Sequence, residues 1–186
     1  MRRLIVTLAA AALAAAACGG GAPAASPTSA APTVPAAKPS SGTETTPPAN
    51  VPALLKFQGR TLDGKPFDGS SLAAKPVVLW FWAPWCPKCQ GEGPAVAKAA
   101  RKYGDKVAFV GVAGLDKNKG QMDAFVARTG TGGLVHLDDR GGDLYRHFKV
   151  TSQSSYLFVN PAGGGHKATG PLSESELSEL VDAHAM

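Results

Sequence analysis

The chain has 186 residues, a formal net charge of +5, 44% hydrophobic residues and 18% charged residues. About 130 residues lie beyond the N-terminal leader and linker described below, which is the size of one compact domain with a single core. The Lys and Arg residues are scattered along the chain rather than clustered, which argues against a nucleic-acid-binding protein.

The first 18 residues have the pattern of an export signal. Two arginines precede an apolar run, residues 4–17, which is long enough for a secretory signal and too short to span a membrane. The segment Ala15–Cys18, with small residues before a lone cysteine, resembles the lipobox of bacterial lipoproteins, although Ala15 stands where Leu is usual. The resemblance implies that Cys18 is lipidated and anchors the protein to the outside of the cell membrane. Ordinary signal-peptide cleavage, which gives a secreted protein, is the alternative.

Residues 19–52 consist almost entirely of Gly, Ala, Pro, Ser and Thr, without apolar periodicity. Such a segment buries too little apolar surface to offset the entropy lost on ordering, so we expect a disordered tether. Its role would be to hold the following domain, residues 53–186, at a distance from the membrane.

From Ala53 onward the composition is that of a folded domain. We expect a short strand near Leu54–Phe57, followed by a hairpin whose turn is Asp63–Gly64. Residues 77–82 are consecutive apolar residues, rich in β-branched and aromatic types, which predicts a strand buried on both faces of a sheet.

The later part of the domain alternates predicted helices and strands. In chain order they are a helix over residues 86–102, a strand over 107–112, a helix near 121–128, a weak strand at 134–137, a helical turn at 143–148, a hairpin of 155–159 and 166–168, and a last helix. Ser173 is placed to cap that last helix together with Glu176. This order predicts an α/β fold with a central mixed β-sheet and helices on both faces.

A cysteine pair lies where the buried strand gives way to a helix. Cys86 at the helix start faces unpaired backbone N–H groups and the positive end of the helix dipole, which stabilise a thiolate. Pro87 suits the first helical turn, and Lys88 adds a cation that favours the thiolate further. Cys89 follows one turn later, within reach of a disulfide. Disulfide exchange needs an exposed attacking thiolate and a second thiol that resolves the mixed disulfide, and we assign these roles to Cys86 and Cys89 respectively.

Three other interpretations of the cysteine pair compete with a redox role. A structural disulfide of this spacing would close a very small loop and gain little loop entropy. A zinc half-site would need two further ligands, and the four histidines show no metal-ligand spacing. The pair could also be accidental. We expect neither a metal nor any other cofactor.

The segment Phe81–Cys89 resembles the active-site segment of the thioredoxin superfamily. Glu92 and Pro94 resemble the TlpA, ResA and DsbE-like branch that works outside the bacterial membrane. The resemblance covers residues 53–186 and implies a thioredoxin-like thiol–disulfide oxidoreductase that acts on exported cysteine-containing proteins and exchanges electrons with a membrane or extracytoplasmic partner. In that branch a glutamate at the position of Glu92 tunes proton transfer. Independently, a carboxylate three residues after Cys89 can take the proton of a buried thiol; an ordinary exposed helix glutamate is the alternative.

The sequence matches the family in one further place and departs from it in two. Trp85 resembles the family's exposed tryptophan and is expected to help dock a peptide substrate. Trp80, expected in the core, stands where thioredoxins proper carry an acid. Ser154 aligns with the family's cis-proline, and a cis bond before Ser costs about 3–4 kcal/mol against roughly 0.5–1 kcal/mol before Pro. This cost favours a trans Gln153–Ser154 bond, but both isomers stay open. We expect Gln153 and Ser154 to contribute to substrate binding, with Ser154 offering a hydroxyl and an N–H to the site.

These features lead to a membrane-tethered, monomeric thiol–disulfide oxidoreductase as the main hypothesis. The thiolate-stabilising features favour an oxidant, whereas similar proteins with a glutamate at position 92 often act as reductants. A peroxide-reducing redoxin is one alternative, but its usual pattern has Thr or Ser three residues before the cysteine, where this chain has Ala83. A non-catalytic module that binds metal through the dithiol is another.

Overall fold

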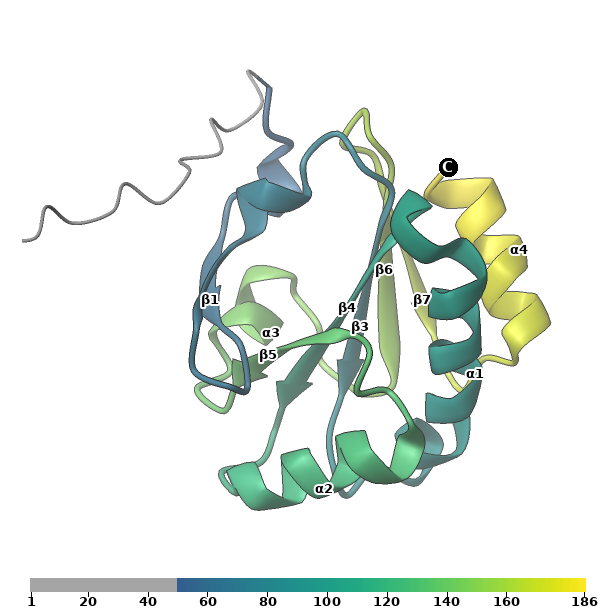
Figure 1. Cartoon of the computed structure of the whole chain (residues 1–186). Helices are drawn as coiled ribbons and strands as arrows, with labels where there is room; N and C mark the ends of the chain where they lie inside the picture. The colour runs from purple at the N-terminus through teal and green to yellow at the C-terminus, as the bar shows by residue number, and fades with distance from the viewer. Residues whose placement is uncertain (1–49) are drawn as a thin grey trace, which may run out of the picture. The chain divides into compact units, whose positions relative to one another are not determined.

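The computed structural model describes residues 50–186 (Figure 1). The predicted leader, the lipidation site Cys18 and nearly all of the predicted tether lie outside this range, and those predictions stay open. Within residues 50–186, no helix is long and apolar enough to cross a membrane.

The main sheet has five strands in the spatial order β5-β4-β3-β6-β7. Its central strand β3 (Val77–Trp82) pairs in parallel with β4 (Ala108–Gly114), which pairs in parallel with β5 (Val135–Asp139). On the other side, β3 pairs antiparallel with β6 (Ser155–Val159), which pairs antiparallel with β7 (Gly165–Thr169). The predicted mixed sheet is confirmed.

Burial of β3 on both faces explains its unbroken apolar sequence. All six of its side chains are buried, and because successive side chains point to opposite faces they divide between two clusters. Val78, Trp80 and Trp82 belong to one cluster, and Val77, Leu79 and Phe81 belong to the other. The strand therefore joins the two halves of the core.

Helices cover both faces of the sheet, as predicted. The cluster around Trp80 and Trp82 includes side chains of α1 (Pro87–Tyr103), α2 (Lys119–Thr129) and α4 (Glu174–His184). The other cluster includes side chains of α3 (Asp143–His147) and of the 3-10 helices η1 (Ala53–Leu55) and η2 (Gly69–Leu72). A third 3-10 helix, η3 (Gly104–Lys106), follows α1.

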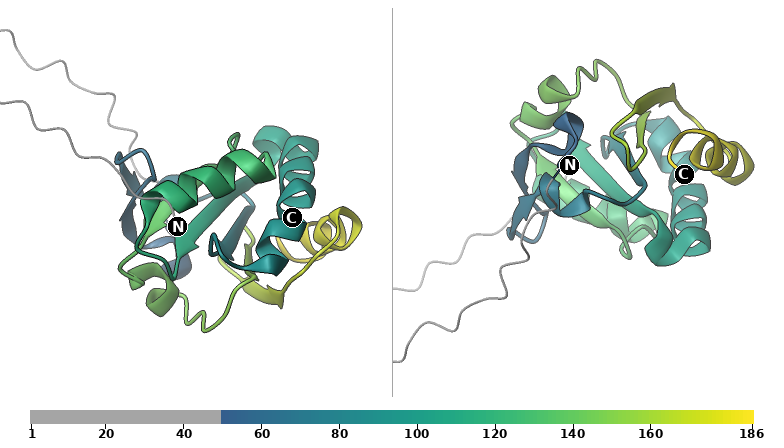
Figure 2. Two further views of the ribbon diagram at one scale, coloured as in Figure 1. Left: turned by 90° about the horizontal axis from the view of Figure 1, so that it is seen from below. Right: turned by 90° about the horizontal axis from the view of Figure 1, so that it is seen from above.

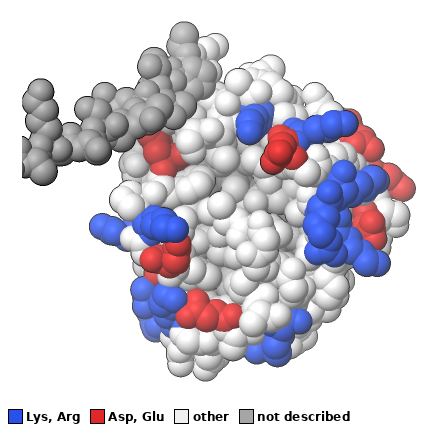
Figure 3. All heavy atoms as spheres, in the orientation of Figure 1, with Lys and Arg blue, Asp and Glu red and all other residues white. Residues whose placement is uncertain are grey.

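Helices α1 and α4 lie side by side (Figure 2). Polar contacts border the apolar interface between them. Lys98 Nζ lies 3.6 Å from a carboxylate oxygen of Glu174, and the Tyr103 hydroxyl donates a 2.7 Å hydrogen bond to Asp182. Figure 3 shows basic and acidic side chains interspersed on this side of the domain.

The start of the domain differs from the prediction in one element. The segment predicted as a strand near Leu54–Phe57 instead begins as η1, and the strand prediction is wrong there. Pro52, with its fixed φ, opens a tight turn in which the Leu55 N–H donates to the Pro52 carbonyl at 2.9 Å. The hairpin prediction is confirmed, since β1 (Gln58–Arg60) pairs antiparallel with β2 (Pro66–Asp68).

The predicted cap of the last helix is confirmed. Ser173 precedes α4, and its hydroxyl accepts the Glu176 N–H at 3.3 Å, while the Glu176 carboxylate accepts the Ser173 N–H at 2.8 Å. This reciprocal capping box satisfies two backbone donors at the helix start.

Candidate active site

The first turn of α1 positions the two cysteines. Cys86 is the N-cap residue of the helix, Pro87 occupies the first helical position, and the Cys86 sulfur accepts the Cys89 N–H at 3.2 Å. A tight turn brings the chain from β3 to this point, with the Cys86 N–H donating to the Ala83 carbonyl at 3.1 Å. The predicted placement of a thiol at a helix N-terminus is therefore confirmed, and an N–H donor faces the sulfur.

The thiols are less exposed than the sequence suggested. Both are unpaired as disulfides in the structure, but Cys86 keeps only 3% of its surface exposed and Cys89 none. The expectation of an openly exposed Cys86 is wrong, because the residue belongs to the apolar cluster that also holds Trp82 and Ala83. Of the two cysteines, only Cys86 offers any surface to a partner, which is consistent with its assignment as the attacking thiol.

Cys89 is held in its protonated form. Burial, together with the hydrogen bond to Cys86, raises the pKa of the Cys89 thiol above its usual range. A thiol of this kind attacks a mixed disulfide only after a base removes its proton. The site therefore requires a proton acceptor near Cys89.

Glu92 is a buried carboxyl group on the same helix as Cys89, and its role as the proton acceptor stays a prediction. It lies one turn beyond Cys89 on α1 and is only 2% exposed, so it is not an ordinary surface glutamate. Burial raises the pKa of Glu92, although hydrogen bonds from the Trp80 side chain and the Leu172 N–H oppose the shift. The charge of Glu92 also contributes to the raised pKa of Cys89. The two groups are therefore electrostatically linked.

Ser154 faces the interior rather than a substrate. It is fully buried, its hydroxyl donates to Glu92 Oε1, and its oxygen accepts the Trp80 Nε1–H at 2.9 Å. The Ser154 hydroxyl is therefore engaged within the site, and substrate contact by the Ser154 N–H stays a prediction. The Gln153–Ser154 bond, whose isomer stayed open on the sequence alone, is cis. The expectations for Ser154 used only local sequence preferences, which do not include its hydrogen bonds with Glu92 and Trp80.

Trp80 is the feature of the site that the sequence did not identify. It was expected to be a core residue and is fully buried, but its indole N–H also donates to Glu92 Oε1 at 2.8 Å. Because side chains alternate along β3, the sequence could indicate that position 80 faces α1. That Ser154 lies nearby follows only from the register of β3 with β6, in which Trp80 pairs with Tyr156. Among residues 50–186, the Tyr156 hydroxyl is buried without a hydrogen-bond partner.

An exposed apolar pair borders the cysteines. Trp85 is 50% exposed and donates a 3.0 Å hydrogen bond from its indole nitrogen to the carbonyl of Leu115, which is itself 46% exposed. Leu115 also lines a hollow of about 680 Å³ together with Tyr145, Val150 and Thr151, among others. Gln153 is half-buried and Lys88 is exposed. Substrate contact by Trp85 and Gln153 stays a prediction.

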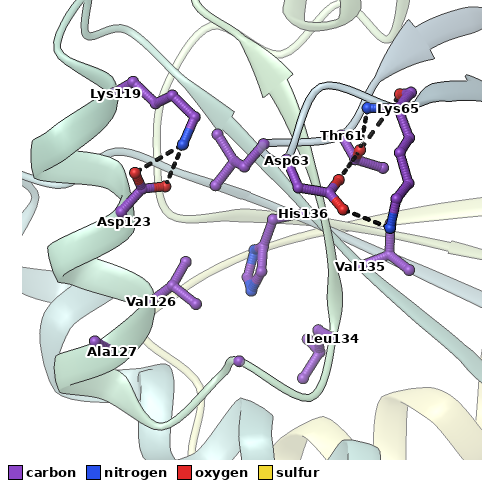
Figure 4. Close-up of a pocket in the computed structure, with 12 residues that line it drawn as sticks. Thr61, Asp63, Lys65, Lys119, Asp123, Val126, Ala127, Leu134, Val135 and His136 are labelled. Atoms are coloured by element: carbon purple, nitrogen blue, oxygen red, sulfur yellow. Dashed lines mark hydrogen bonds and ion pairs between the residues drawn. The ribbon is translucent and has the colours of Figure 1, made fainter.

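A second pocket, of about 690 Å³, lies between the β1–β2 turn, α2 and β5 (Figure 4). The charged groups on its rim are paired: Lys119 with Asp123 at 2.7 Å and Lys65 with Asp63 at 2.8 Å. His136 is also satisfied, since its Nδ1 accepts the Trp82 indole N–H at 3.2 Å and its Nε2 contacts the Thr131 carbonyl oxygen at 3.0 Å. None of the residues that line this pocket belongs to the segment that carries the cysteines.

Comparisons with known proteins agree with this geometry. The model of the family described as Redoxin matches residues 31–160, a range that includes Cys86, Cys89, Glu92 and Ser154. The chain is 46% identical to MTB DsbF, solved in mixed oxidized and reduced forms, with a TM-score of 0.68 over 72% of this chain and 98% of that chain.

Two further relatives are secreted proteins. A Mycobacterium tuberculosis disulfide oxidoreductase homologous to E. coli DsbE is 37% identical, with a TM-score of 0.65 over 70% of this chain and 97% of that chain. The soluble secreted antigen MPT53 of Mycobacterium tuberculosis is 37% identical over 132 residues, which are 69% of this chain and 75% of that protein.

Proposed function

Because the chain belongs to the Redoxin family, with a thioredoxin-like fold, we propose that it exchanges disulfides with exported proteins through Cys86 and Cys89. Relatives named as disulfide oxidoreductases support this enzyme class. The single observation that carries the proposal is the arrangement of the two sulfurs. Cys86 caps α1 and accepts an N–H, and the fully buried Cys89 lies one turn behind it.

In the oxidising direction, the reaction begins with a disulfide between Cys86 and Cys89. A substrate thiolate attacks the Cys86 sulfur, which forms a mixed disulfide and breaks the bond to Cys89. Cys89 leaves as a thiolate and takes a proton, which protonated Glu92 can supply. A second substrate thiolate then attacks the substrate sulfur of the mixed disulfide and releases the Cys86 thiolate. Two electrons pass from the substrate, which gains a disulfide, to the cysteine pair.

We propose that this oxidising direction is the physiological one. The Cys86 sulfur lies at the N-terminus of α1 and accepts the Cys89 N–H, an arrangement that favours the reduced form of the pair over its disulfide. A stabilised reduced form makes a stronger oxidant.

A redox titration in glutathione buffers tests both the cysteine pair and its direction. We expect one two-electron transition that is absent in both Cys86→Ser and Cys89→Ser, with a potential above about −200 mV. A potential near that of thioredoxin, about −270 mV, would refute the oxidising direction. A transition that persists in either variant would refute the assignment of the pair.

The relatives also support a location outside the cytoplasm, and we propose that lipidated Cys18 anchors the protein to the outer face of the cell membrane. The sequence Ala15–Cys18 supports this anchor, whereas MPT53 is named as a soluble secreted protein. In cells fed an alkyne fatty acid, we expect labelling of the full chain and its recovery with membranes. The Cys18→Ala variant should lose both. An unlabelled native protein found in the medium would show the secreted alternative to be correct.

A further inference from the structure

We propose that Ser154 is a positioning residue for Glu92, whose hydroxyl sets the pH range in which Glu92 can remove the proton of Cys89. This inference rests on the proposed disulfide exchange and adds a residue to it. Its basis is a buried set of hydrogen bonds, the Glu92 network, made up of Glu92, Ser154, Trp80 and the Leu172 N–H.

The direction of the hydrogen bonds in the Glu92 network is defined by chemistry. The Trp80 indole N–H can only donate, and it lies 2.9 Å from the Ser154 oxygen and 2.8 Å from Glu92 Oε1. The Ser154 oxygen thus accepts a hydrogen bond from the Trp80 N–H, which leaves its own O–H to donate to Glu92 Oε1. The Leu172 N–H donates to Glu92 Oε2 at 3.0 Å. Every partner in this network donates toward the carboxylate, and donors of this kind stabilise the ionised form.

The network leaves little space around the carboxylate. A Cβ atom added at Gly170 would lie 2.4 Å from Glu92 Oε2 and 3.0 Å from the Ser154 oxygen. The Gly170 N–H also donates to the Ser154 carbonyl at 3.0 Å, which joins the segment before β6 to the segment after β7. Tertiary contacts therefore hold the Ser154 hydroxyl in place, whereas a solvent-exposed hydroxyl would rotate freely.

Two opposing effects act on Glu92, and Ser154 contributes to one of them. Burial raises the pKa of Glu92, while hydrogen bonds from Trp80 and the Leu172 N–H and the charge of Lys88 lower it. The Ser154 hydroxyl donates to the same carboxylate and should act in the same direction as these donors. The other titratable groups near it are Cys89 on the same helix and the unpartnered hydroxyl of Tyr156 on β6. Without the Ser154 hydroxyl, burial would be opposed less, so the pKa of Glu92 should rise further. Because only the ionised carboxylate can accept a proton, the pH range for proton removal should shift upward.

The test follows the step in which Cys89 acts. Reduced protein is mixed with excess 5,5′-dithiobis(2-nitrobenzoate) in a stopped-flow instrument between pH 5 and 9. Cys86 first releases one thionitrobenzoate in a bimolecular phase, and Cys89 then releases the second in an intramolecular phase whose rate does not depend on reagent concentration. The readout is the midpoint of the acidic fall in the rate of that second phase.

In Ser154→Ala we expect this midpoint to move up by about one pH unit, with the rate recovering at high pH. Ser155→Ala is the matched control, because the hydroxyl of this neighbour donates only to the Ser152 carbonyl, and it should leave the midpoint unchanged. Trp80→Phe keeps an aromatic ring but removes the indole N–H, so it should shift the midpoint in the same direction. If Ser154→Ala does not fold, Trp80→Phe still tests the inference.

Glu92→Gln separates the inference from the function on which it rests. We expect this variant to resolve the mixed disulfide more slowly and to show no midpoint between pH 5 and 9, its rate rising steadily with pH as the Cys89 thiol itself ionises. If Glu92→Gln does so while Ser154→Ala and Trp80→Phe leave the midpoint in place, the positioning role of Ser154 is wrong but the role of Glu92 stands. If Glu92→Gln keeps the native pH profile, the role of Glu92 itself is wrong. A uniform loss of rate in Ser154→Ala without a shift would also overturn the inference.

Discussion

Cys86→Ser should abolish disulfide exchange, with a loss of turnover on the order of 1,000-fold or more, because a neutral hydroxyl cannot replace a thiolate as nucleophile. Cys89→Ser should also fail to turn over, but for a different reason. Its Cys86 can still form a mixed disulfide, but the variant cannot form the Cys86–Cys89 disulfide that oxidises the substrate. The measurement is oxidative refolding of a reduced, disulfide-containing substrate, coupled to a glutathione buffer.

The third cysteine of the chain provides the control for this experiment. Cys18→Ala removes a thiol without touching the site, so the purified variant should retain full turnover. Turnover by Cys86→Ser comparable to that of the native protein would contradict the assignment of the nucleophile. Equal loss in Cys18→Ala would point instead to chemistry that does not reside in the Cys86–Cys89 pair.

Phe125→Ala should destabilise the folded domain by about 3–5 kcal/mol, the usual cost of truncating a fully buried phenylalanine. The Phe125 ring is fully buried on α2 and stacks on Trp82, with ring centroids 4.1 Å apart and an angle of 10° between the planes. It also lies 5.9 Å from the ring of Trp80. The variant would therefore leave a cavity beside the strand that leads to the cysteines. Urea denaturation monitored by far-UV circular dichroism gives the free energy of unfolding.

Phe67→Ala is the matched control, because it removes the same type of side chain from a different part of the domain. Phe67 lies on the β1–β2 hairpin and is only half-buried, with its ring 6.2 Å from that of Phe57. A partly buried ring should contribute less, so we expect a loss of roughly 1–2 kcal/mol. Equal losses for the two variants would contradict the view that α2 is anchored to β3 through Phe125.

The parts of the fold that the sequence predicted are those with strong local signals. The apolar residues of β3 could be identified without a partner strand because every side chain is buried. Helix α1 was predicted from a proline in its first turn, and α4 from a capping box at Ser173. Each of these signals lies within a few residues of the element it defines.

The Glu92 network could not be predicted in the same way because its members are distant in the sequence. Trp80 and Ser154 are 74 residues apart, and Glu92 and Leu172 are 80 residues apart. Their contact depends on the antiparallel register of β3 with β6, which no local pattern specifies. For the same reason, local preference could not decide the isomer of the Gln153–Ser154 bond, which is cis. The near-complete burial of Cys86 likewise depends on the surrounding apolar cluster.

The most direct test of the redox assignment is to locate the covalent intermediate. Cys89→Ser protein is incubated with a reduced substrate peptide and oxidised glutathione, quenched with acid, digested and analysed by mass spectrometry without reduction. In the Cys86–Cys89 segment we expect a mixed disulfide at residue 86 of Cys89→Ser, and none at residue 89 when Cys86→Ser is treated in the same way. An adduct at residue 89 of Cys86→Ser, or no adduct at residue 86 of Cys89→Ser, would contradict the account.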